Sequence, residues 1–244
     1  MTQYRWNKQE LAAGYDASAE YVHPHYLELQ QFLIDLLLGA DATGYVVDLG
    51  GGTGRLAERI LAASPTARVL VIDQSEAALE FAARRMEPFG GRGQVALSRL
   101  QDDWTPLLAD RPTAVVSMSA IHHLDAGEKQ QLYQRCFDCL AEGGILANGD
   151  EIRDADDAVY LQQMQAWGRH MDAMIAAGKV AESFHDALHQ WQARNIGGFG
   201  EPRTSGDDCH QTIAEQLDYF RQAGFRQVDA PWHRDMWAVL HGVK

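Results

Sequence analysis

Several features that other classes of protein require are scarce in this sequence of 244 residues. Three cysteines (Cys136, Cys139 and Cys209) are too few for the disulfide framework of a small secreted protein, so we expect a reducing compartment. No apolar run approaches the ~20 residues that span a bilayer. The beginning of the chain also lacks the apolar stretch of a signal peptide. We therefore expect a cytoplasmic protein with no membrane partner.

Positive charge is scarce as well. The chain has 21 Lys and Arg residues against 34 Asp and Glu residues, which gives a formal net charge of −13. Nucleic acids and anionic membrane surfaces are bound through concentrated Lys and Arg side chains. The charge balance therefore argues against a nucleic-acid partner and favours a small molecule. With only 7 prolines and 46% apolar residues, the chain is expected to form a packed globule.

Strand-like and helix-like segments alternate through the first two thirds of the chain. Short apolar runs are typical of buried strands, and they occur at residues 45–49, 68–72, 95–97, 114–118 and 145–147. Alternation with helices predicts an α/β fold with a doubly wound, mostly parallel sheet. Two alternating runs near 226–228 and 236–240, joined through Pro231, predict a terminal antiparallel hairpin, which makes seven strands.

The pattern predicts a single domain with four parts. They are an N-terminal helical cap (1–40), a core (45–150), a helical lid insertion (154–210), and a final helix with the hairpin (211–244).

A glycine-rich loop, DLGGGTG (48–54), follows the first strand directly. Its G-x-G-x-G spacing differs from the G-x-G-x-x-G of dinucleotide-binding proteins, and no Lys-Ser/Thr pair follows as in a P-loop. Asp48, just before the glycines, is well placed for an ammonium group, and Asp73, at the end of the second strand, for a ribose diol. Two carboxylates, a glycine loop and no cationic phosphate clamp predict a nucleoside ligand that is itself cationic.

These motifs, in their order along the chain, resemble those of the class I S-adenosylmethionine-dependent methyltransferases. The similar segments are VVDLGGGTG, RVLVID, LQDDW and AVVSMSAIHHL, all within residues 45–150. The resemblance implies a Rossmann-like methyltransferase fold and S-adenosylmethionine as the cofactor. It implies cofactor contacts from Asp48, Gly50, Gly52 and Gly54 (methionine part), Asp73 (ribose), Gln74 and either Asp102 or Asp103 (adenine), and Met118 and Ser119 (main chain).

The segment YDASAEY (15–21) resembles the part that folds over the cofactor in many small-molecule methyltransferases. The resemblance implies that Tyr15 covers the methionine end of the cofactor and that Tyr21 or His23 reaches the acceptor. Packing of the two tyrosines within an amphipathic helix is the alternative. In the lid, Trp167 and Trp191 are candidates for an aromatic wall of the acceptor pocket, and core packing is again the alternative.

Candidate catalytic residues lie at the carboxyl edge of the predicted sheet. His122 or His123, just beyond the fourth strand, is the candidate general base, because a pKa of ~6.5 suits proton removal near neutrality. Either histidine could instead cap the next helix or bind the main chain. Asp150 and Glu151 follow the fifth strand, where they could orient an acceptor or simply be solvated acids at a strand exit.

Two other patterns are set aside. Cys136 and Cys139 form a C-x-x-C, but within a predicted helix, where they are expected to be buried apolar residues. His185 and His189 have the i, i+4 spacing of a metal pair, yet the sequence offers no convincing third ligand. No metal is therefore expected.

The sequence thus predicts an enzyme that transfers a methyl group from S-adenosylmethionine to an O or N atom of a small molecule by in-line displacement. Methylation of tRNA or protein is the nearest alternative, and scattered arginines and the net charge weigh against RNA. An NAD-dependent oxidoreductase is disfavoured by the glycine spacing, and a non-catalytic cofactor-binding protein is a third alternative. The acceptor and the oligomeric state, a homodimer included, stay open.

Overall fold

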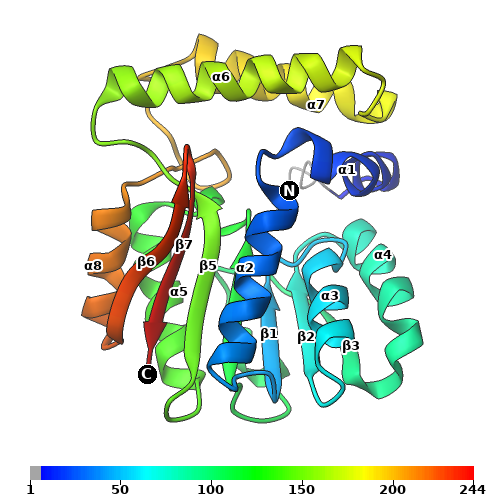
Figure 1. The fold of residues 1–244 in the computed structure, drawn as a ribbon, viewed down its shortest axis with the longest axis vertical. Helices are drawn as coiled ribbons and strands as arrows, with labels where there is room; N and C mark the ends of the chain where they lie inside the picture. Colours follow the sequence, from blue (N-terminus) through cyan, green and yellow to red (C-terminus); the bar gives the residue numbers. More distant parts are fainter. Residues whose placement is uncertain (1–6) are drawn as a thin grey trace.

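The computed structural model describes residues 7–244, which form a seven-stranded sheet flanked by helices (Figure 1). The strand order is β3-β2-β1-β4-β5-β7-β6, with β7 antiparallel to β5 and β6 antiparallel to β7. This confirms the predicted doubly wound fold with an antiparallel terminal hairpin. The strands are β1 (Tyr45–Leu49), β2 (Arg68–Asp73), β3 (Gly93–Leu97), β4 (Ala114–Met118), β5 (Ile145–Glu151), β6 (Arg226–Arg234) and β7 (Trp237–Val243).

Eight α-helices surround this sheet in the described part of the chain. They are α1 (Gln9–Val22), α2 (Tyr26–Gly39), α3 (Arg55–Ala63), α4 (Glu76–Met86), α5 (Ala126–Cys139), α6 (Asp157–Ala176), α7 (Glu182–Gln192) and α8 (Ile213–Ala223). The short 3-10 helices are η1 (Glu87–Arg92), η2 (Thr105–Leu107) and η3 (Ile121–His123), and a π-helical turn, η4, covers Ala193–Gly197.

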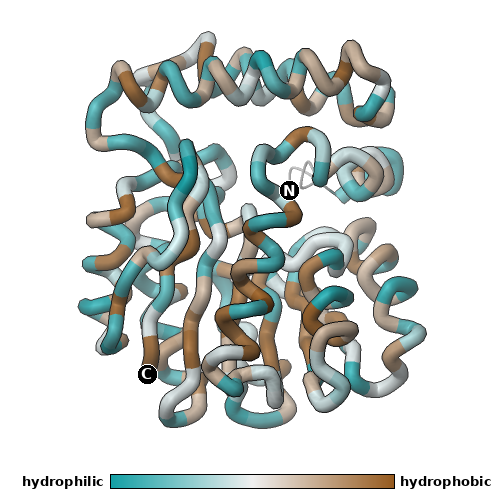
Figure 2. The backbone as a smooth tube through the Cα atoms, in the orientation of Figure 1, coloured by the Kyte–Doolittle hydropathy of each residue, from teal (hydrophilic) through white to brown (hydrophobic). Residues whose placement is uncertain are grey.

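The sheet is covered on both faces, which explains its uninterrupted apolar strands. Side chains of α2, α3 and α4, such as Leu33 and Ile60, pack on one face, and side chains of α5 and α8, such as Tyr133 and Phe220, pack on the other. Figure 2 shows the hydrophobic segments concentrated along the strands and the adjoining helices. Capping boxes fix where α5 and α8 begin, at Asp125 and Thr212 respectively.

Two details of the sheet differ from the sequence prediction. Strand β5 continues to Glu151, where it pairs with Trp237 of β7, so Asp150 and Glu151 belong to the strand and do not follow it. Both are 2% exposed, so their interpretation as solvated acids is wrong. Pro231 lies within β6, and the hairpin turns near Asp235 instead (φ 51°). An edge strand tolerates proline because one side of it needs no hydrogen-bond partner.

Helices α6 and α7 lie across the carboxyl ends of the strands (Figure 1). They are joined to α1 by hydrogen bonds from Trp167 Nε1 to the Val22 carbonyl (2.7 Å) and from the Ala181 amide to Ser18 Oγ (2.9 Å). Buried lid side chains also continue the core of one sheet face. The predicted lid therefore forms a packed layer. Within residues 7–244, no helix is both long and apolar enough to cross a membrane.

Candidate active site

A cavity of about 490 Å³ lies at the carboxyl end of the sheet, between the strand ends and the cover formed by α1, α6 and α7. Its floor includes residues that follow β1, β2 and β4. The strand order reverses between β1 and β4, and doubly wound folds bind ligands at this switch point. Its volume is within the range of small-molecule and cofactor sites.

The glycine loop forms one wall of this cavity. Gly50 and Gly52 have positive φ angles (66° and 54°), which favour glycine. A Cβ atom on Gly52 would meet no other atom of residues 7–244 within 4 Å, so the loop backbone is open to a ligand there. Gly54 differs, because it is the N-cap of α3 and its Cβ position faces Ala82 at 3.1 Å, away from the cavity lining.

Asp48 lines the cavity beside this loop. Its side chain is buried, and within residues 7–244 neither carboxylate oxygen has a hydrogen-bond partner. Burial, with a smaller contribution from the charge of Asp73, raises the pKa of Asp48 to about 7. A buried carboxylate without donors is costly, and a cationic ligand group would stabilise it.

Asp73 is held by the main chain at the end of β2. Its Oδ2 accepts a hydrogen bond from the Gly52 amide (3.0 Å), and its Oδ1 accepts one from the Ser75 amide (2.8 Å). Burial raises the pKa of Asp73, although these backbone hydrogen bonds oppose the effect. The carboxylate thus connects the glycine loop to the beginning of α4 at the cavity wall.

Helix α1 covers the glycine loop through charged contacts. Asp16 accepts hydrogen bonds from Thr53 Oγ1 (2.6 Å) and from Arg85 (2.8 Å), and Arg55 pairs with Glu20 (2.9 Å). These contacts place the half-buried Tyr15 in the cavity wall, in edge contact with the rings of His23 and Phe184.

Arg85→Ala is expected to loosen α1. The change removes the ion pair to Asp16 of α1 (2.8 Å), which is partly exposed and stabilises that helix by about 1 kcal/mol, together with the ion pair to Glu58 of α3 (2.7 Å). Hydrogen exchange of the α1 amides should accelerate roughly fivefold, while the core strands keep their protection. Arg84→Ala is the matched control, since within residues 7–244 the Arg84 side chain donates only to the Glu80 carbonyl of its own helix and stacks on Phe81. Equal exchange rates in both variants would contradict this role.

A cluster of imidazoles and carboxylates lies across the cavity from Asp48. His122, in η3 just after β4, has its Nδ1 2.7 Å from Asp150 Oδ1, and its main-chain amide donates to Asp150 Oδ2 (2.9 Å). The Glu151 carboxylate also contacts this Nδ1. Burial opposes protonation of His122, but the two carboxylates outweigh it and raise the His122 pKa well above its usual value.

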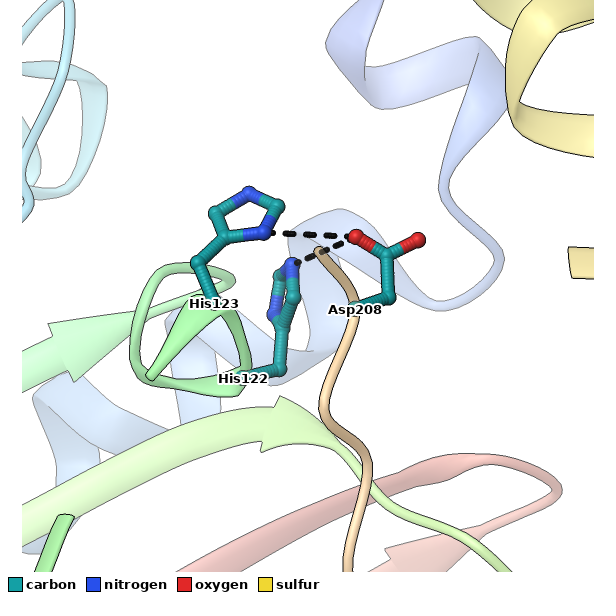
Figure 3. A group of neighbouring side chains, drawn as sticks. All are labelled: His122, His123 and Asp208. Atoms are coloured by element: carbon teal, nitrogen blue, oxygen red, sulfur yellow. Dashed lines mark ion pairs between the residues drawn. The ribbon is translucent and has the colours of Figure 1, made fainter. Parts of the chain in front are cut away.

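His123 and Asp208 complete the cavity side of this cluster (Figure 3). Asp208 Oδ1 lies 3.2 Å from His123 Nδ1 and 4.0 Å from His122 Nε2. Asp208 Oδ2 accepts a hydrogen bond from Asn195 Nδ2 (2.6 Å). Although burial alone would raise the pKa of Asp208, the His123 hydrogen bond and the nearby imidazoles hold it well below its usual value.

Behind these residues lies a fully buried layer. His210 Nδ1 is 2.5 Å from the Tyr160 hydroxyl, and its Nε2 is 3.9 Å from Glu151 Oε2. Burial lowers the pKa of His210 to about 3 and raises that of Glu151 to about 7. Lys129 donates from Nζ to the Cys209 carbonyl (2.5 Å), which anchors the segment that carries Asp208.

The sequence analysis missed part of this cluster. Asp208, His210, Asn195 and Lys129 belong to it, but the segment before Asp208 reads as a polar loop. The available signal was the run Asp-Asp-Cys-His (207–210) at the end of that loop, and nothing local places it beside η3.

His23 stands between the cluster and the lid. It lies in ring contact with Tyr26, Trp167 and Trp237, and its Nδ1 is 3.8 Å from Glu151 Oε1. Burial lowers the pKa of His23 to about 3, so its imidazole is neutral. It faces the cavity as part of an otherwise aromatic wall.

Most residues named from the sequence line the cavity. They are Tyr15, His23, Asp48, Gly50, Gly52, Asp73, Met118, Ser119, His122, His123, Glu151, Trp167 and Trp191. Gly54, Gln74, Asp102, Asp103, Asp150 and Tyr21 are absent from the lining.

The positions outside the lining have identifiable surroundings. Asp102 and Asp103 are exposed, and Asp103 accepts hydrogen bonds from Thr105. Tyr21 faces Lys179, whose Nζ lies 5.6 Å from the ring centre. Asp150 contacts Nδ1 and the main-chain amide of His122.

The C-x-x-C pair lies within α5, as predicted. Cys136 is buried, and Cys139 donates from Sγ to the Cys136 carbonyl. Burial raises the pKa of both thiols, the reverse of what a reactive thiolate requires.

The sheet order and the cavity define the class of protein as a doubly wound α/β protein with a nucleoside-type ligand site. Residues 47–146 match the family described as "Methyltransferase domain". The fold is shared with the magnesium protoporphyrin IX methyltransferase of Synechocystis, solved with bound SAH (TM-score 0.62, 14% identity, covering 98% of this chain and 96% of that one). Residues 47–146 are thus similar to a methyltransferase domain, as the motifs of that segment predicted, and the chain shares its fold with a methyltransferase of known structure.

Curated relatives match over part of their length. An uncharacterized methyltransferase of Oceanobacillus iheyensis is 27% identical over 147 residues, 59% of this chain and 62% of that protein. The 2,7-dihydroxy-5-methyl-1-naphthoate 7-O-methyltransferase of Streptomyces carzinostaticus is 29% identical over 172 residues, 68% of this chain and 50% of that protein. The chain thus spans between one half and two thirds of the length of these two relatives.

Proposed function

We propose that the chain is an S-adenosylmethionine-dependent methyltransferase that acts on an O or N atom of a small-molecule acceptor. The observation that carries the proposal is Asp48, a buried carboxylate on the cavity wall whose two oxygens have no hydrogen-bond partner within residues 7–244. The amino group of the cofactor's methionine part is a cation of the kind that this carboxylate lacks.

The surrounding residues fit the rest of that cofactor. The open backbone at Gly52 leaves room for it, and Asp73 can accept hydrogen bonds from the ribose hydroxyls while the main chain holds it in place. Met118 and Ser119 line the same cavity at the end of β4. Tyr15, on the cover formed by α1, also lines this cavity.

The cofactor supplies a methyl group on positively charged sulfur, which passes to the acceptor atom while the bonding electron pair stays on sulfur. The chain must hold the acceptor in line with that bond, which can supply ~7–11 kcal/mol in favourable cases. For an acceptor that carries a proton, we propose that one of His122 and His123 accepts it, and His123 is favoured because the neighbouring carboxylates raise the pKa of His122 and keep its imidazole protonated. The side chain of His123 is 24% exposed against 8% for His122, so His123 is the more accessible of the two.

The remaining lining favours a small acceptor with an apolar body. Several lid side chains on the cavity wall are aromatic or apolar, namely Trp167, Met171, Phe184 and Trp191, and polar lid residues such as Asp186 and Arg194 line it as well. The Streptomyces relative is named for methylation of a hydroxyl on a naphthoate, a molecule of this kind. The formal net charge of −13 weighs against a nucleic-acid acceptor.

Calorimetry with S-adenosylhomocysteine and with NADH tests the proposal. We expect the first to bind in the micromolar range and NADH to give no heat of binding. Transfer of a labelled methyl group to a panel of hydroxylated aromatic acids and amines then identifies the acceptor class. Binding of NADH without binding of S-adenosylhomocysteine would overturn the proposed function.

A further inference from the structure

Three potential metal-ligand atoms converge on the cavity side of the imidazole–carboxylate cluster (Figure 3). They belong to His122, His123 and Asp208, and they lie within 4.8 Å of one another. The distances to Asp208 Oδ1 are 3.2 Å from His123 Nδ1 and 4.0 Å from His122 Nε2. A tetrahedral ion with ligand bonds of about 2.1 Å separates its ligand atoms by about 3.4 Å. The two measured distances lie on either side of that value, so small side-chain shifts would complete the geometry.

Two of the three proposed ligands, His122 and Asp208, are each oriented by a buried hydrogen bond that uses the atom not facing the site. His122 Nδ1 faces Asp150 Oδ1 at 2.7 Å, which directs the ring so that Nε2 points to Asp208. Asp208 Oδ2 accepts from Asn195 Nδ2 at 2.6 Å, which leaves Oδ1 for the site. Metal-ligating histidines almost always donate their other N–H to a carboxylate or carbonyl, and ligating carboxylates are in turn hydrogen-bonded.

The surroundings are rich in buried negative charge and have unused polar atoms. Asp150, Glu151 and Asp208 are 2%, 2% and 5% exposed. Within residues 7–244, Glu151 Oε1 and His210 Nε2 are buried without a hydrogen-bond partner, and Glu151 Oε2 contacts His122. Such atoms are costly to bury unless a ligand satisfies them. A cation between the imidazoles would balance the carboxylates that surround it.

We propose that His122, His123 and Asp208 bind one divalent transition-metal ion at the acceptor end of the cavity. Two imidazoles and one carboxylate suit Zn²⁺, Fe²⁺, Co²⁺ or Ni²⁺, whereas Mg²⁺ and Ca²⁺ prefer oxygen ligands. All three ligands line the cavity, so the remaining coordination positions face the acceptor. When bound, the ion would act as a Lewis acid that lowers the pKa of an acceptor hydroxyl, and His122 and His123 would then serve as its ligands and not as the base. The Lewis-acid role rests on the proposed function, whereas the binding of the metal ion does not.

The sequence did not predict this site because its ligands come from distant segments. His122 and His123 are adjacent, but the third ligand, Asp208, lies 85 positions beyond His123 in the numbering and approaches them only through the fold. The i, i+4 pair His185 and His189 on α7 takes no part in it.

Metal-free protein, prepared by dialysis against EDTA, should be titrated with Co²⁺. We expect one equivalent to bind, to produce visible d–d absorption, and to be displaced by Zn²⁺; Mg²⁺ at the same concentration should produce no displacement. Asp208→Asn and His123→Ala should each lower the Co²⁺ affinity by 10-fold or more. Asp150→Asn, which keeps all three ligands but changes the partner of His122 Nδ1, should lower it by roughly 10- to 100-fold. His189→Ala, an exposed histidine, should bind Co²⁺ as the wild type does.

Calorimetry with S-adenosylhomocysteine on every variant reports whether the chain is folded and whether the cofactor binds. His123→Ala keeps the experiment decisive if Asp208→Asn fails to fold, because the His123 side chain is the more exposed of the two. The metal site is overturned if the wild type binds no Co²⁺, or if His123→Ala binds it with wild-type affinity. Either result, together with normal binding of S-adenosylhomocysteine, would leave the proposed function intact. Loss of that binding in the wild type would instead count against the proposed function.

Discussion

Replacing Asp48 by Asn is expected to make the ligand-free protein more stable at pH 8 and to weaken its binding of S-adenosylhomocysteine. Burial raises the pKa of Asp48 from an ordinary 3.8 to about 7. Between these two values the carboxyl is ionised in the unfolded chain and protonated in the folded one, so the free energy of unfolding falls as the pH rises. Above pH 7 the buried, ionised Asp48 lowers the free energy of unfolding by its full amount, about 4 kcal/mol.

Asn has nearly the same shape as Asp and does not ionise. Allowing for its own buried amide, we expect the Asp48→Asn variant to gain about 2–4 kcal/mol at pH 8, and less at pH 5, in urea unfolding measurements. Its affinity for S-adenosylhomocysteine should fall at least tenfold, because a hydrogen bond to a charged group contributes about 1.5–3 kcal/mol. Asp110→Asn, at an exposed acid, is the control. Unchanged affinity in Asp48→Asn would place the ligand's amino group elsewhere.

Asp73→Ala should have the largest effect on cofactor affinity. The change removes the acceptor for the Gly52 and Ser75 amides, so it disturbs the glycine loop and the beginning of α4 as well as the proposed ribose contact. Because two charge-assisted hydrogen bonds are lost, we expect the affinity for S-adenosylhomocysteine to fall by about 100-fold or more. The free energy of unfolding should fall by about 1–3 kcal/mol, since two donors lose their partner.

Asp73→Asn separates these two effects. Its amide oxygen can still accept from the Ser75 amide, so the stability should return toward that of the wild type while the affinity stays low. Calorimetry and urea unfolding measure the two quantities independently. If Asp73→Ala bound S-adenosylhomocysteine as tightly as the wild type, the ribose would have to lie away from the end of β2.

The cofactor side of the site was predictable because its signals are local. Asp48, the glycines and Asp73 all lie at ends of adjacent parallel strands, and such ends meet at one edge of the sheet. Apolar strand runs and helical periodicity were sufficient to locate five of the strands along the chain. The hairpin turn was misplaced, because Pro231 resembles a turn residue when the position of β6 at the edge is unknown.

The acceptor side was less predictable for a physical reason. Its cluster joins η3, the end of β5 and the segment around Asp208, which the fold brings together through pairings that no local pattern encodes. The length of β5 depends on the pairing of Glu151 with Trp237, so the burial of its last two acids could not be predicted from residues 145–151 alone.

The hydrogen bonds between α1 and the lid have a consequence for how ligands exchange. Helix α1 covers the glycine loop, and α6 covers the acceptor end, yet Val22 is bonded to Trp167 and Ser18 to Ala181. A movement that uncovers one end must therefore break these bonds or carry the other helix along. We therefore expect α1, α6 and α7 to move together when the cavity opens. The spent cofactor and the product would then leave in the same opening movement.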